Sequence, residues 1–515
     1  MRAAFVLFLL SASTTAAQDL VLEGALPADA PPYTALSFEV PEGTVEIEVR
    51  HDDRSEANVL DWGLADPSGV RGWGGGNTEP AIVGTEAASR SYLPGPIEAG
   101  EWQVLVGQAL VEDPPARYRV EIFFRDAPTL SPDADRGAFT PPAALETGAR
   151  WYAGDFHVHS IESGDAFATI DECATLAGER GLDFIELSEH NTVSQVDFLS
   201  AAQERHPAVL LMPGIEVTSY FGHGNAMGVP SFVDFRARSE LGVTLETMVA
   251  ETEAAGGLFA INHPVLDIGD LCLGCAWDLG TPAAIGAVEI QNGAYSVTGT
   301  LFYRNALAFW DAMLDEGSRA AAIGGSDDHR AGMDLGALQS PIGSPTTMVY
   351  ADALSVAAIV AAVRAGRTVV KLEGPGDPMV ELTAGDAMVG DTVDGPVTLR
   401  AVVTGATSGR LAFVRNGEIH TQVDVTSDPF EATLDVDAPF GDTDDRWRAQ
   451  LSMPRPRVVT SHVWVRASGE APPPDAGPGG GSGGGCGCRS ANGTGSAWLA
   501  LLGGLLARRR SRASA

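Results

Sequence analysis

The residues of this sequence that could carry out chemistry are histidines and carboxylates in the middle of the chain. Seven of the ten histidines lie between His157 and His329, and most follow directly after short apolar runs that are typical of buried strands. His157 and His159 are two positions apart in an extended segment, so their side chains project from the same face. Imidazole and carboxylate ligands without cysteine are typical of zinc, manganese and iron sites. This part of the sequence therefore predicts a metal centre.

The candidate ligands outnumber the needs of a single cation. They share a position at or just after the end of a predicted strand, and they are His157, His159, His190, Glu216, His223, His263, Asp327 and His329, with Glu189 beside His190. Such a set predicts two or three divalent metal ions, Zn, Mn or Fe. Paired cations make water a nucleophile near neutral pH and stabilise charge on a carbonyl or phosphoryl oxygen. We therefore expect a hydrolase that acts on a small-molecule ester or phosphoester substrate.

The segments that must position these residues alternate between strand and helix patterns from about residue 150 to 375. Strands are predicted at 183–187, 209–212, 258–261, 287–290 and 320–323. Helical character lies at 170–180, 244–255, 300–316 and 356–364. Such alternation predicts an α/β barrel or a doubly wound sheet. In an α/β barrel the carboxyl ends of the strands form the active site, which would bring the ligands onto one rim.

The segments on either side of this region have a different pattern. Period-two alternation at 45–50, 102–106 and 118–123 predicts an N-terminal β-sandwich over residues 18–138. We expect this domain to serve mainly as a packing accessory, with carbohydrate or partner binding as the alternative. Alternation returns at 398–403 and 462–465, which predicts a second β-sandwich over residues 377–468.

Four motifs, in this order, resemble the polymerase-and-histidinol-phosphatase (PHP) domain. They are Asp155–Ser160 (DFHVHS), Ser188–Thr192 (SEHNT), Asn262–Pro264 (NHP) and Gly325–His329 (GSDDH). The segment from Glu216 to His223 and the flanking domains are most similar to the carbaryl-hydrolase-like branch of that family. The resemblance covers about residues 150–375, and it implies a distorted seven-stranded (β/α) barrel with a di- or trinuclear metal centre.

The resemblance also implies how the ligands are shared among the metals. By motif, it assigns His157, His159, Glu216 and Asp327 to one metal, Glu216, His223 and His263 to a second, and Asp165, His190 and His329 to a third.

Two positions depart from the family pattern. Asp165 stands where some relatives have histidine, and a carboxylate there favours a harder metal. Glu189 stands where an aspartate is common, and it is either a residue that orients a ligand or a proton donor. We favour the first role for Glu189. Arg330 is a candidate for holding an anionic group of the substrate, with a surface salt bridge as the alternative.

The composition excludes several other functions. Lysine and arginine number 33 against 68 acidic residues, a net charge of −35, which argues against nucleic-acid binding because phosphate backbones are repelled. Lys371 is the one lysine in the chain, so a phosphate-binding loop of the Gly-Lys-Ser/Thr type is excluded.

Both ends of the chain read as targeting signals. A charged start, a short apolar run and small residues at 15–17 predict a secretory signal peptide over residues 1–17. A Pro/Gly-rich linker at 469–485 precedes residues 486–515, where a cysteine, a short apolar segment and an arginine cluster follow one another. This end resembles the MYXO-CTERM sorting tag, and an ordinary tail anchor is the alternative. We expect an exported protein held at the cell surface or outer envelope, with export and tag-processing machinery as partners.

The remaining cysteines predict one disulfide and one buried thiol. Cys272 and Cys275 are spaced for a small-loop disulfide in an oxidising compartment. Cys173 lies in an amphipathic helical pattern, where it is expected to be a buried hydrophobe.

A second reading of the whole chain is a surface-anchored binding or adhesion protein whose metals are structural and not catalytic. Two β-sandwiches and a surface tag agree with it. Structural metal sites, however, are usually closed by few ligands, whereas an excess of strand-end histidines favours an open site.

Overall fold

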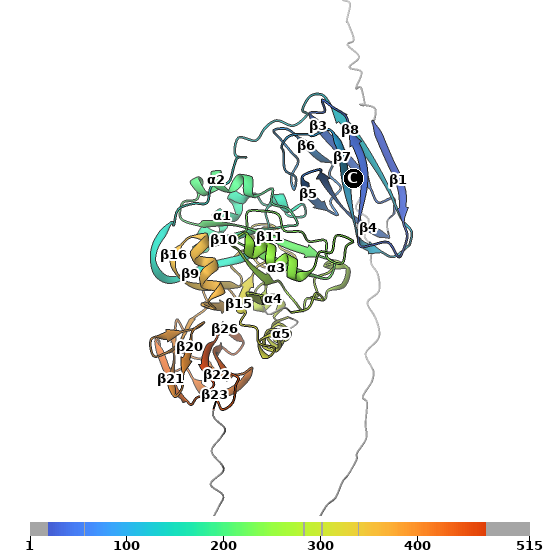
Figure 1. Cartoon of the computed structure of the whole chain (residues 1–515). Coiled ribbons are helices and arrows are strands. Elements are labelled where there is room, and N and C mark those ends of the chain that lie inside the picture. Colours follow the sequence, from blue (N-terminus) through green and yellow to red (C-terminus); the bar gives the residue numbers. More distant parts are fainter. Residues whose placement is uncertain (1–18, 56, 282–283, 300–301, 338, 470–515) are drawn as a thin grey trace, which may run out of the picture. The chain divides into compact units, whose positions relative to one another are not determined.

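The computed structural model describes residues 19–469 except 56, 282–283, 300–301 and 338 (Figure 1). The chain divides into two compact units, Met1–Glu470 and Ala471–Ala515, and every described residue belongs to the first. The predicted signal peptide, the surface tag and the linker beyond residue 469 therefore lie outside the described residues. Within the described part, no helix combines the length and the apolar character needed to cross a membrane.

The N-terminal segment forms two four-stranded antiparallel sheets, ordered β1-β8-β3-β6 and β2-β7-β4-β5. Their bounds are β1 (Leu20–Leu26), β2 (Tyr33–Val40), β3 (Glu46–Asp52), β4 (Asn58–Asp66), β5 (Gly69–Gly75), β6 (Ala81–Gly84), β7 (Gly100–Val111) and β8 (Ala116–Arg125). Apolar side chains of both sheets, among them Ile47 and Trp102, form one core. The strands predicted at 45–50, 102–106 and 118–123 are confirmed within β3, β7 and β8.

The central segment contains a row of seven neighbouring strands. These are β9 (Glu146–Val158), β10 (Phe184–His190), β11 (Leu210–Ser219), β12 (Gly222–Met227), β13 (Leu258–Ile261), β14 (Ala287–Asn292) and β15 (Ala321–Gly325). β12 runs antiparallel to both of its neighbours, and the other neighbouring pairs are parallel. At the carboxyl ends of β9 and β15 the chain is joined by two backbone hydrogen bonds, from Asp327 N to His157 O and from His159 N to Asp328 O.

Short helices connect these strands. They are α1 (Ile170–Glu179), α2 (Val196–Arg205), α3 (Leu245–Ala254), α4 (Tyr295–Thr298), α5 (Tyr303–Asp315) and α6 (Val356–Arg364), with 3-10 turns η1 (Ile161–Ser163) and η2 (Gly269–Leu271). α1 begins where the sequence predicts, because Thr169 and Glu172 form a capping box there. The helices predicted at 170–180, 244–255, 300–316 and 356–364 correspond to α1, α3, α5 and α6, whereas α2 was not predicted.

The sheet does not end at these seven strands. β9 also pairs with β16 (Thr346–Leu354), which pairs with β17 (Thr368–Lys371), and β17 pairs with β26 of the C-terminal segment. The result is one sheet of 15 strands that runs from the central segment into the next. The mixed α/β class is confirmed, but its helices are few, and hydrogen bonding crosses the predicted boundary near residue 376.

The C-terminal segment adds ten strands, β18 (Met379–Ala384), β19 (Ala387–Met388), β20 (Thr392–Asp394), β21 (Val397–Thr404), β22 (Arg410–Arg415), β23 (Glu418–Asp424), β24 (Phe430–Val436), β25 (Asp445–Ser452), β26 (Pro456–Thr460) and β27 (Val463–Arg466). β19-β18-β21-β24 form a separate four-stranded sheet, and the other strands belong to the long sheet. An apolar core that includes Leu399 and Trp447 joins the two layers.

Candidate metal centre

The predicted ligands gather where the central strands end. The structure places His157 in β9, His159 directly after it, Asp165 after η1, His190 at the end of β10, Glu216 in β11, His223 in β12, His263 after β13, and Asp327 and His329 after β15. All nine residues come from the carboxyl ends of strands, from the short strand β12 or from adjoining turns. Strand pairing therefore brings together side chains that lie up to 172 positions apart, from His157 to His329.

Glu216 lies at the middle of this group. Its carboxylate is fully buried, and five imidazoles surround it: His190 Nδ1 at 2.7 Å, His157 Nε2 and His263 Nε2 at 3.3 Å, His223 Nδ1 at 3.5 Å and His159 Nε2 at 3.8 Å. A single carboxylate cannot satisfy five imidazoles by hydrogen bonding alone, because it has two oxygens. The arrangement suits a carboxylate that bridges cations.

Asp327 forms a second focus of the group. Its Oδ1 lies 3.2 Å from His159 Nε2 and 3.3 Å from His157 Nε2, and 3.7 Å from His329 Nδ1. Its backbone has a φ of +57°, in the left-handed region that non-glycine residues rarely adopt. The backbone of His263 also has positive φ, at +25°. Backbone strain of this kind gathers at functional sites, where the surrounding fold holds it in place.

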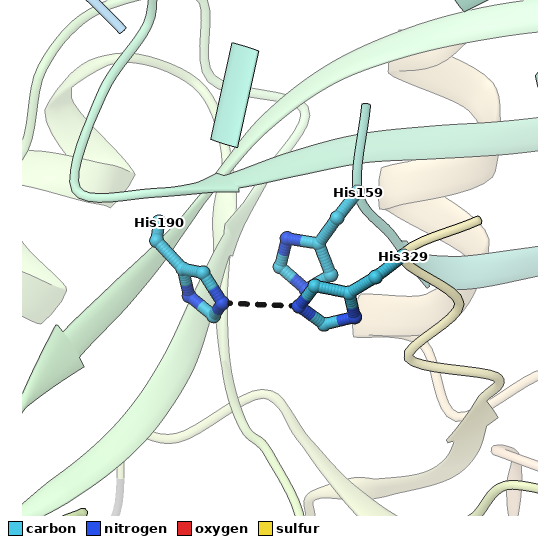
Figure 2. Close-up of side chains that lie close together, drawn as sticks. All are labelled: His159, His190 and His329. Carbon is cyan, nitrogen blue, oxygen red and sulfur yellow. Dashed lines mark hydrogen bonds between the residues drawn. The ribbon is translucent and has the colours of Figure 1, made fainter. Parts of the chain in front are cut away.

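A third focus lies at the outer side of the group. Asp165 Oδ2 is 3.4 Å from His190 Nε2 and 3.5 Å from His329 Nε2. Figure 2 shows the side chains of His159, His190 and His329 directed toward one another, with the Nε2 atoms of His190 and His329 only 3.3 Å apart. Two imidazole nitrogens at this distance need a proton or a cation between them.

Four buried nitrogens of the group have no hydrogen-bond partner among the described residues: His157 Nε2, His159 Nε2, His223 Nδ1 and His263 Nδ1. Buried polar atoms are almost always satisfied, so these four point to a ligand. Among the described residues, three triads of histidines and carboxylates place one donor atom from each residue within 4.8 Å of the others, namely His159–His190–His329, His157–His159–Asp327 and His157–Glu216–His263. The residues therefore fit a centre of divalent cations. The triads overlap the three sets that the resemblance implies, with His159 and His157 each shared between two of them.

The electrostatics of the group favour positive charge. Burial raises the pKa of the Glu216 carboxyl, but His157 and His190 outweigh burial and hold it well below its usual range. Burial lowers the pKa of His157, yet Asp327, Glu216 and Glu289 hold it well above 6.5. His159 differs, because burial and its neighbours His329 and His190 lower its pKa to about 3. Ionised carboxylates around a neutral imidazole provide ligands that a cation requires.

Several supporting residues were missed by sequence reasoning. Glu289 Oε1 lies 3.3 Å from His157 Nδ1, and its Oε2 accepts a hydrogen bond of 2.7 Å from the His263 backbone N–H. Ser163 Oγ lies 3.1 Å from His159 Nδ1, and Asn262 donates to Glu216 at 2.9 Å. Such contacts fix the orientation of ligands. The available signal was the charge of Glu289 within the apolar strand at 287–290.

The two predicted catalytic residues occupy different places. Glu189 is fully buried, accepts hydrogen bonds from Ser160 N and Oγ at 3.0 and 2.6 Å, and does not line the cleft described below. Burial raises its pKa to about 8. Arg330 does line the cleft, and its guanidinium lies 4.5 Å over the Phe167 ring. Among the described carboxylates, none is within 4.0 Å of Arg330, so its alternative role in a salt bridge is not seen.

The candidate ligands lie at the base of an open cleft of about 1270 Å³. Seven of the nine line it, namely Asp165, His190, Glu216, His223, His263, Asp327 and His329. The disulfide Cys272–Cys275 forms as predicted, and Cys272 lies at the edge of the cleft. Cys173 is free and buried, which is also confirmed. Because candidate ligands line this open cleft, a substrate can reach them from solvent.

Comparison with protein families finds no match, and comparison with curated proteins finds none either. Among solved structures, the chain is similar to a two-domain protein from Bacteroides vulgatus ATCC 8482 that contains a predicted PHP-like metal-dependent phosphoesterase, with 18% identity over 64% of this chain and 98% of that one and a TM-score of 0.35. An engineered protein matches with 12% identity over 55% of this chain and 49% of that one, at a TM-score of 0.16. Neither TM-score reaches 0.5, so neither likeness establishes a shared fold.

Proposed function

We propose that the protein is an exported metal-dependent hydrolase of the PHP family that cleaves a phosphoester or a carboxyl or carbamate ester. The proposal includes closure of β9–β15 into a distorted seven-stranded barrel. It depends above all on one observation, which is that four buried imidazole nitrogens without a hydrogen bond lie among ionised carboxylates at the base of an open cleft. The overlapping triads support two or three cations in this group.

The roles of the residues follow from their contacts. Glu216 and Asp327 would hold cations together with His157, His159 and His263, and His190, His329 and Asp165 would hold another. Divalent cations, when bound, lower the pKa of water and polarise the substrate oxygen. Glu289 orients His157 through Nδ1, and Ser163 orients His159. Glu189 fixes Ser160, the residue after His159, and is a positioning residue in this proposal.

Hydrolysis is favoured over a purely structural metal site by the shape of the centre. Structural sites are closed by four protein ligands, whereas catalytic sites keep positions open to water and substrate. Here His190, His263 and His329 line a cleft of about 1270 Å³. The alternative, a surface binding or adhesion protein with non-catalytic metals, would not require metal ligands that face the cleft.

We also propose where the protein acts. The predicted signal peptide at 1–17 would direct export, and the predicted tag at 486–515 would hold the protein at the cell surface. The disulfide Cys272–Cys275 supports an oxidising compartment. Its substrate would then be a small molecule outside the cytoplasm.

The test measures metal content and hydrolysis together. The purified protein, supplied with manganese, zinc and iron, should hold about two or three ions per chain and should hydrolyse chromogenic esters or phosphodiesters. His157→Ala should lose most of both. His206→Ala is the matched control, because His206 pairs with Asp171 away from the cleft. Retention of metal and hydrolysis by His157→Ala would show that the centre is misassigned. A full metal complement without turnover would favour the binding protein.

A further inference from the structure

The cleft is not built by the central segment alone. Residues of the N-terminal sandwich form part of its lining, namely Val59, Asp61, Trp73, the 74–77 turn and Ala109. The four residues of this turn read Gly-Gly-Gly-Asn. Gly74 lies close to Gly164, the residue before Asp165, because a Cβ added to Gly164 would be 3.1 Å from Gly74 O. The expectation that this domain serves mainly as a packing accessory is thus incomplete, because it also forms a wall of the cleft.

The position of this wall is fixed by specific contacts with the central segment. Tyr220, in the turn between β11 and β12, donates a hydrogen bond of 2.7 Å from Oη to Asp61 Oδ2. The Tyr220 ring stacks on Tyr33 with centroids 4.9 Å apart, and Trp73 meets Phe235 at 4.7 Å. These aromatic contacts belong to a buried cluster. The sandwich is held in place at the site where it faces the cleft.

Among the described residues of this wall, Asp61 is the one with a charged side chain. Its Oδ2 receives the Tyr220 hydroxyl, but its Oδ1 has no hydrogen-bond partner among the described residues. Burial raises the pKa of Asp61 to about 6, opposed by the hydrogen bond from Tyr220 and by the charge of His190, while the charge of Asp165 adds to the rise. Asp61 is therefore close enough to His190 and Asp165 for their charges to act on it.

The rest of the lining is mainly apolar and acidic. Apart from the candidate metal ligands, the lining carboxylates are Asp61, Asp267, Asp270 and Asp334, and Arg330 is the single arginine or lysine among the described lining residues. Apolar side chains such as Phe167, Leu271 and Phe302 supply much of the remaining surface. These carboxylates would repel an anionic group that lay beside them in the cleft, whereas they would not repel an apolar or cationic group.

We propose that Asp61 of the N-terminal sandwich is a specificity-determining residue of the cleft, which favours esters whose remote group is uncharged or cationic over esters whose remote group is anionic. This rests on the proposed function, because it names the substrate class of the same site. The reacting ester would lie at the metal ligands, and the remote group would lie between them and the wall. The Oδ1 atom of Asp61 would accept a hydrogen bond from, or pair with, that group.

The test compares two pairs of aryl esters, and the members of each pair differ in the charge of the remote group. Aryl acetates and methyl aryl phosphodiesters, each with a 3-trimethylammonium or a 3-carboxylate substituent, are offered to the metal-loaded protein. The ratio of kcat/KM for the cationic over the anionic ester is compared between variants, so the intrinsic reactivity of the esters cancels. Asp61→Asn keeps the shape and removes the charge, and it should lower this ratio about tenfold. Asp29→Asn, an exposed change of the same charge in the same sandwich, should leave the ratio unchanged.

Two outcomes would overturn the proposal. One is a ratio in Asp61→Asn within twofold of the unaltered protein at equal metal content, and the other is a preference of the unaltered protein for the anionic ester beyond the difference between the uncatalysed hydrolysis rates of the two esters. Binding of phenyltrimethylammonium, measured by calorimetry, gives a readout that does not need turnover. If no ester is hydrolysed but Asp61→Asn still weakens this binding about tenfold, the proposed hydrolase fails and the subsite holds. Equal binding by both proteins would show that the subsite is wrong.

Discussion

The two β-sandwiches relate to the central segment in opposite ways. The N-terminal sandwich has two sheets of its own, yet Asp61 and Trp73 line the cleft. The C-terminal segment shares the long sheet through β17 and β26, yet no described residue beyond Gln339 lines the cleft. Continuity of the sheet therefore does not indicate which domain contributes to the site. The side chains that line the cleft show which domain contributes.

The contacts of each domain explain the difference. The C-terminal segment meets the central segment through charge, because the fully buried Arg448 binds both carboxylate oxygens of Asp311 on α5 at 2.5 and 2.8 Å. The N-terminal sandwich meets it through aromatic rings beside the cleft, with Tyr220 and Tyr33 stacked. We infer that the first contact serves stability and that the second serves the position of the cleft wall.

The largest effect that would test this contrast is expected at Arg448. Arg448→Met should remove about 3–5 kcal/mol of stability, because the partly buried Asp311 is left without its main partner. Urea unfolding would measure the loss. The value of kcat/KM should stay within twofold at temperatures where the variant is folded. Arg400→Met, which breaks an exposed pair with Glu431 in the same domain, should leave the stability almost unchanged. A large fall in kcat/KM for Arg448→Met would contradict the division of roles.

A smaller effect is expected at the cleft wall. Tyr220→Phe removes the hydrogen bond to Asp61, which is worth about 1.5–3 kcal/mol because its acceptor is charged. The selectivity between the cationic and anionic esters should fall severalfold, with a modest loss of stability. Tyr350→Phe is the control, since its ring packs on Trp151 away from the cleft. An unchanged selectivity in Tyr220→Phe would show that the contact between Tyr220 and the sandwich does not influence the cleft.

The smallest effect concerns the response of the N-terminal sandwich to acid. Burial lowers the pKa of His51 to about 4, although the backbone of Glu79 and the charge of Asp52 oppose it. The folded chain then keeps His51 neutral near pH 5.5 while the unfolded chain takes up a proton. Stability should fall as the pH drops from about 6.5 toward 4, by about 1.4 kcal/mol at pH 5.5.

The measurement compares urea unfolding at pH 7.5 and 5.5. His51→Phe, which can keep the stacking on Trp62, should lose less stability between the two pH values than the unaltered protein. Exposed His420 of the C-terminal segment provides the control variant His420→Phe. An identical pH response in His51→Phe and the unaltered protein would show that His51 does not contribute.

Sequence reasoning found the strands and the candidate ligands because both carry local signals. The apolar run at 258–261 is β13 as predicted, and His263 follows it. α2 was missed because its first turn lacks a side-chain cap, with Gln195 at the N-cap position. Its large apolar residues Val196, Phe198 and Leu199 span only four positions, which is too short a stretch to show a clear helical period.

The supporting residues could not be predicted for a different reason. Glu289 contacts His157 across 132 positions of sequence, and Asp61 contacts Tyr220 across 159. No local sequence pattern indicates a contact between residues so far apart in the chain, because strand order and domain packing bring them together. Asp61 also lies between Leu60 and Trp62 in a strand pattern that explains all three residues without a site. The contribution of the N-terminal sandwich to the cleft could therefore be recognised only from the structure.

The pairing of β17 with β26 has a consequence for how the protein could be shortened. Val369 and Val370 are fully buried and pair with Thr460 and Val459. Removal of the C-terminal segment would turn β17 into an apolar edge strand with unpaired backbone groups, which is a template for intermolecular pairing. A chain cut after Gly376 would therefore aggregate, and the last domain acts as the molecule's protection against self-association.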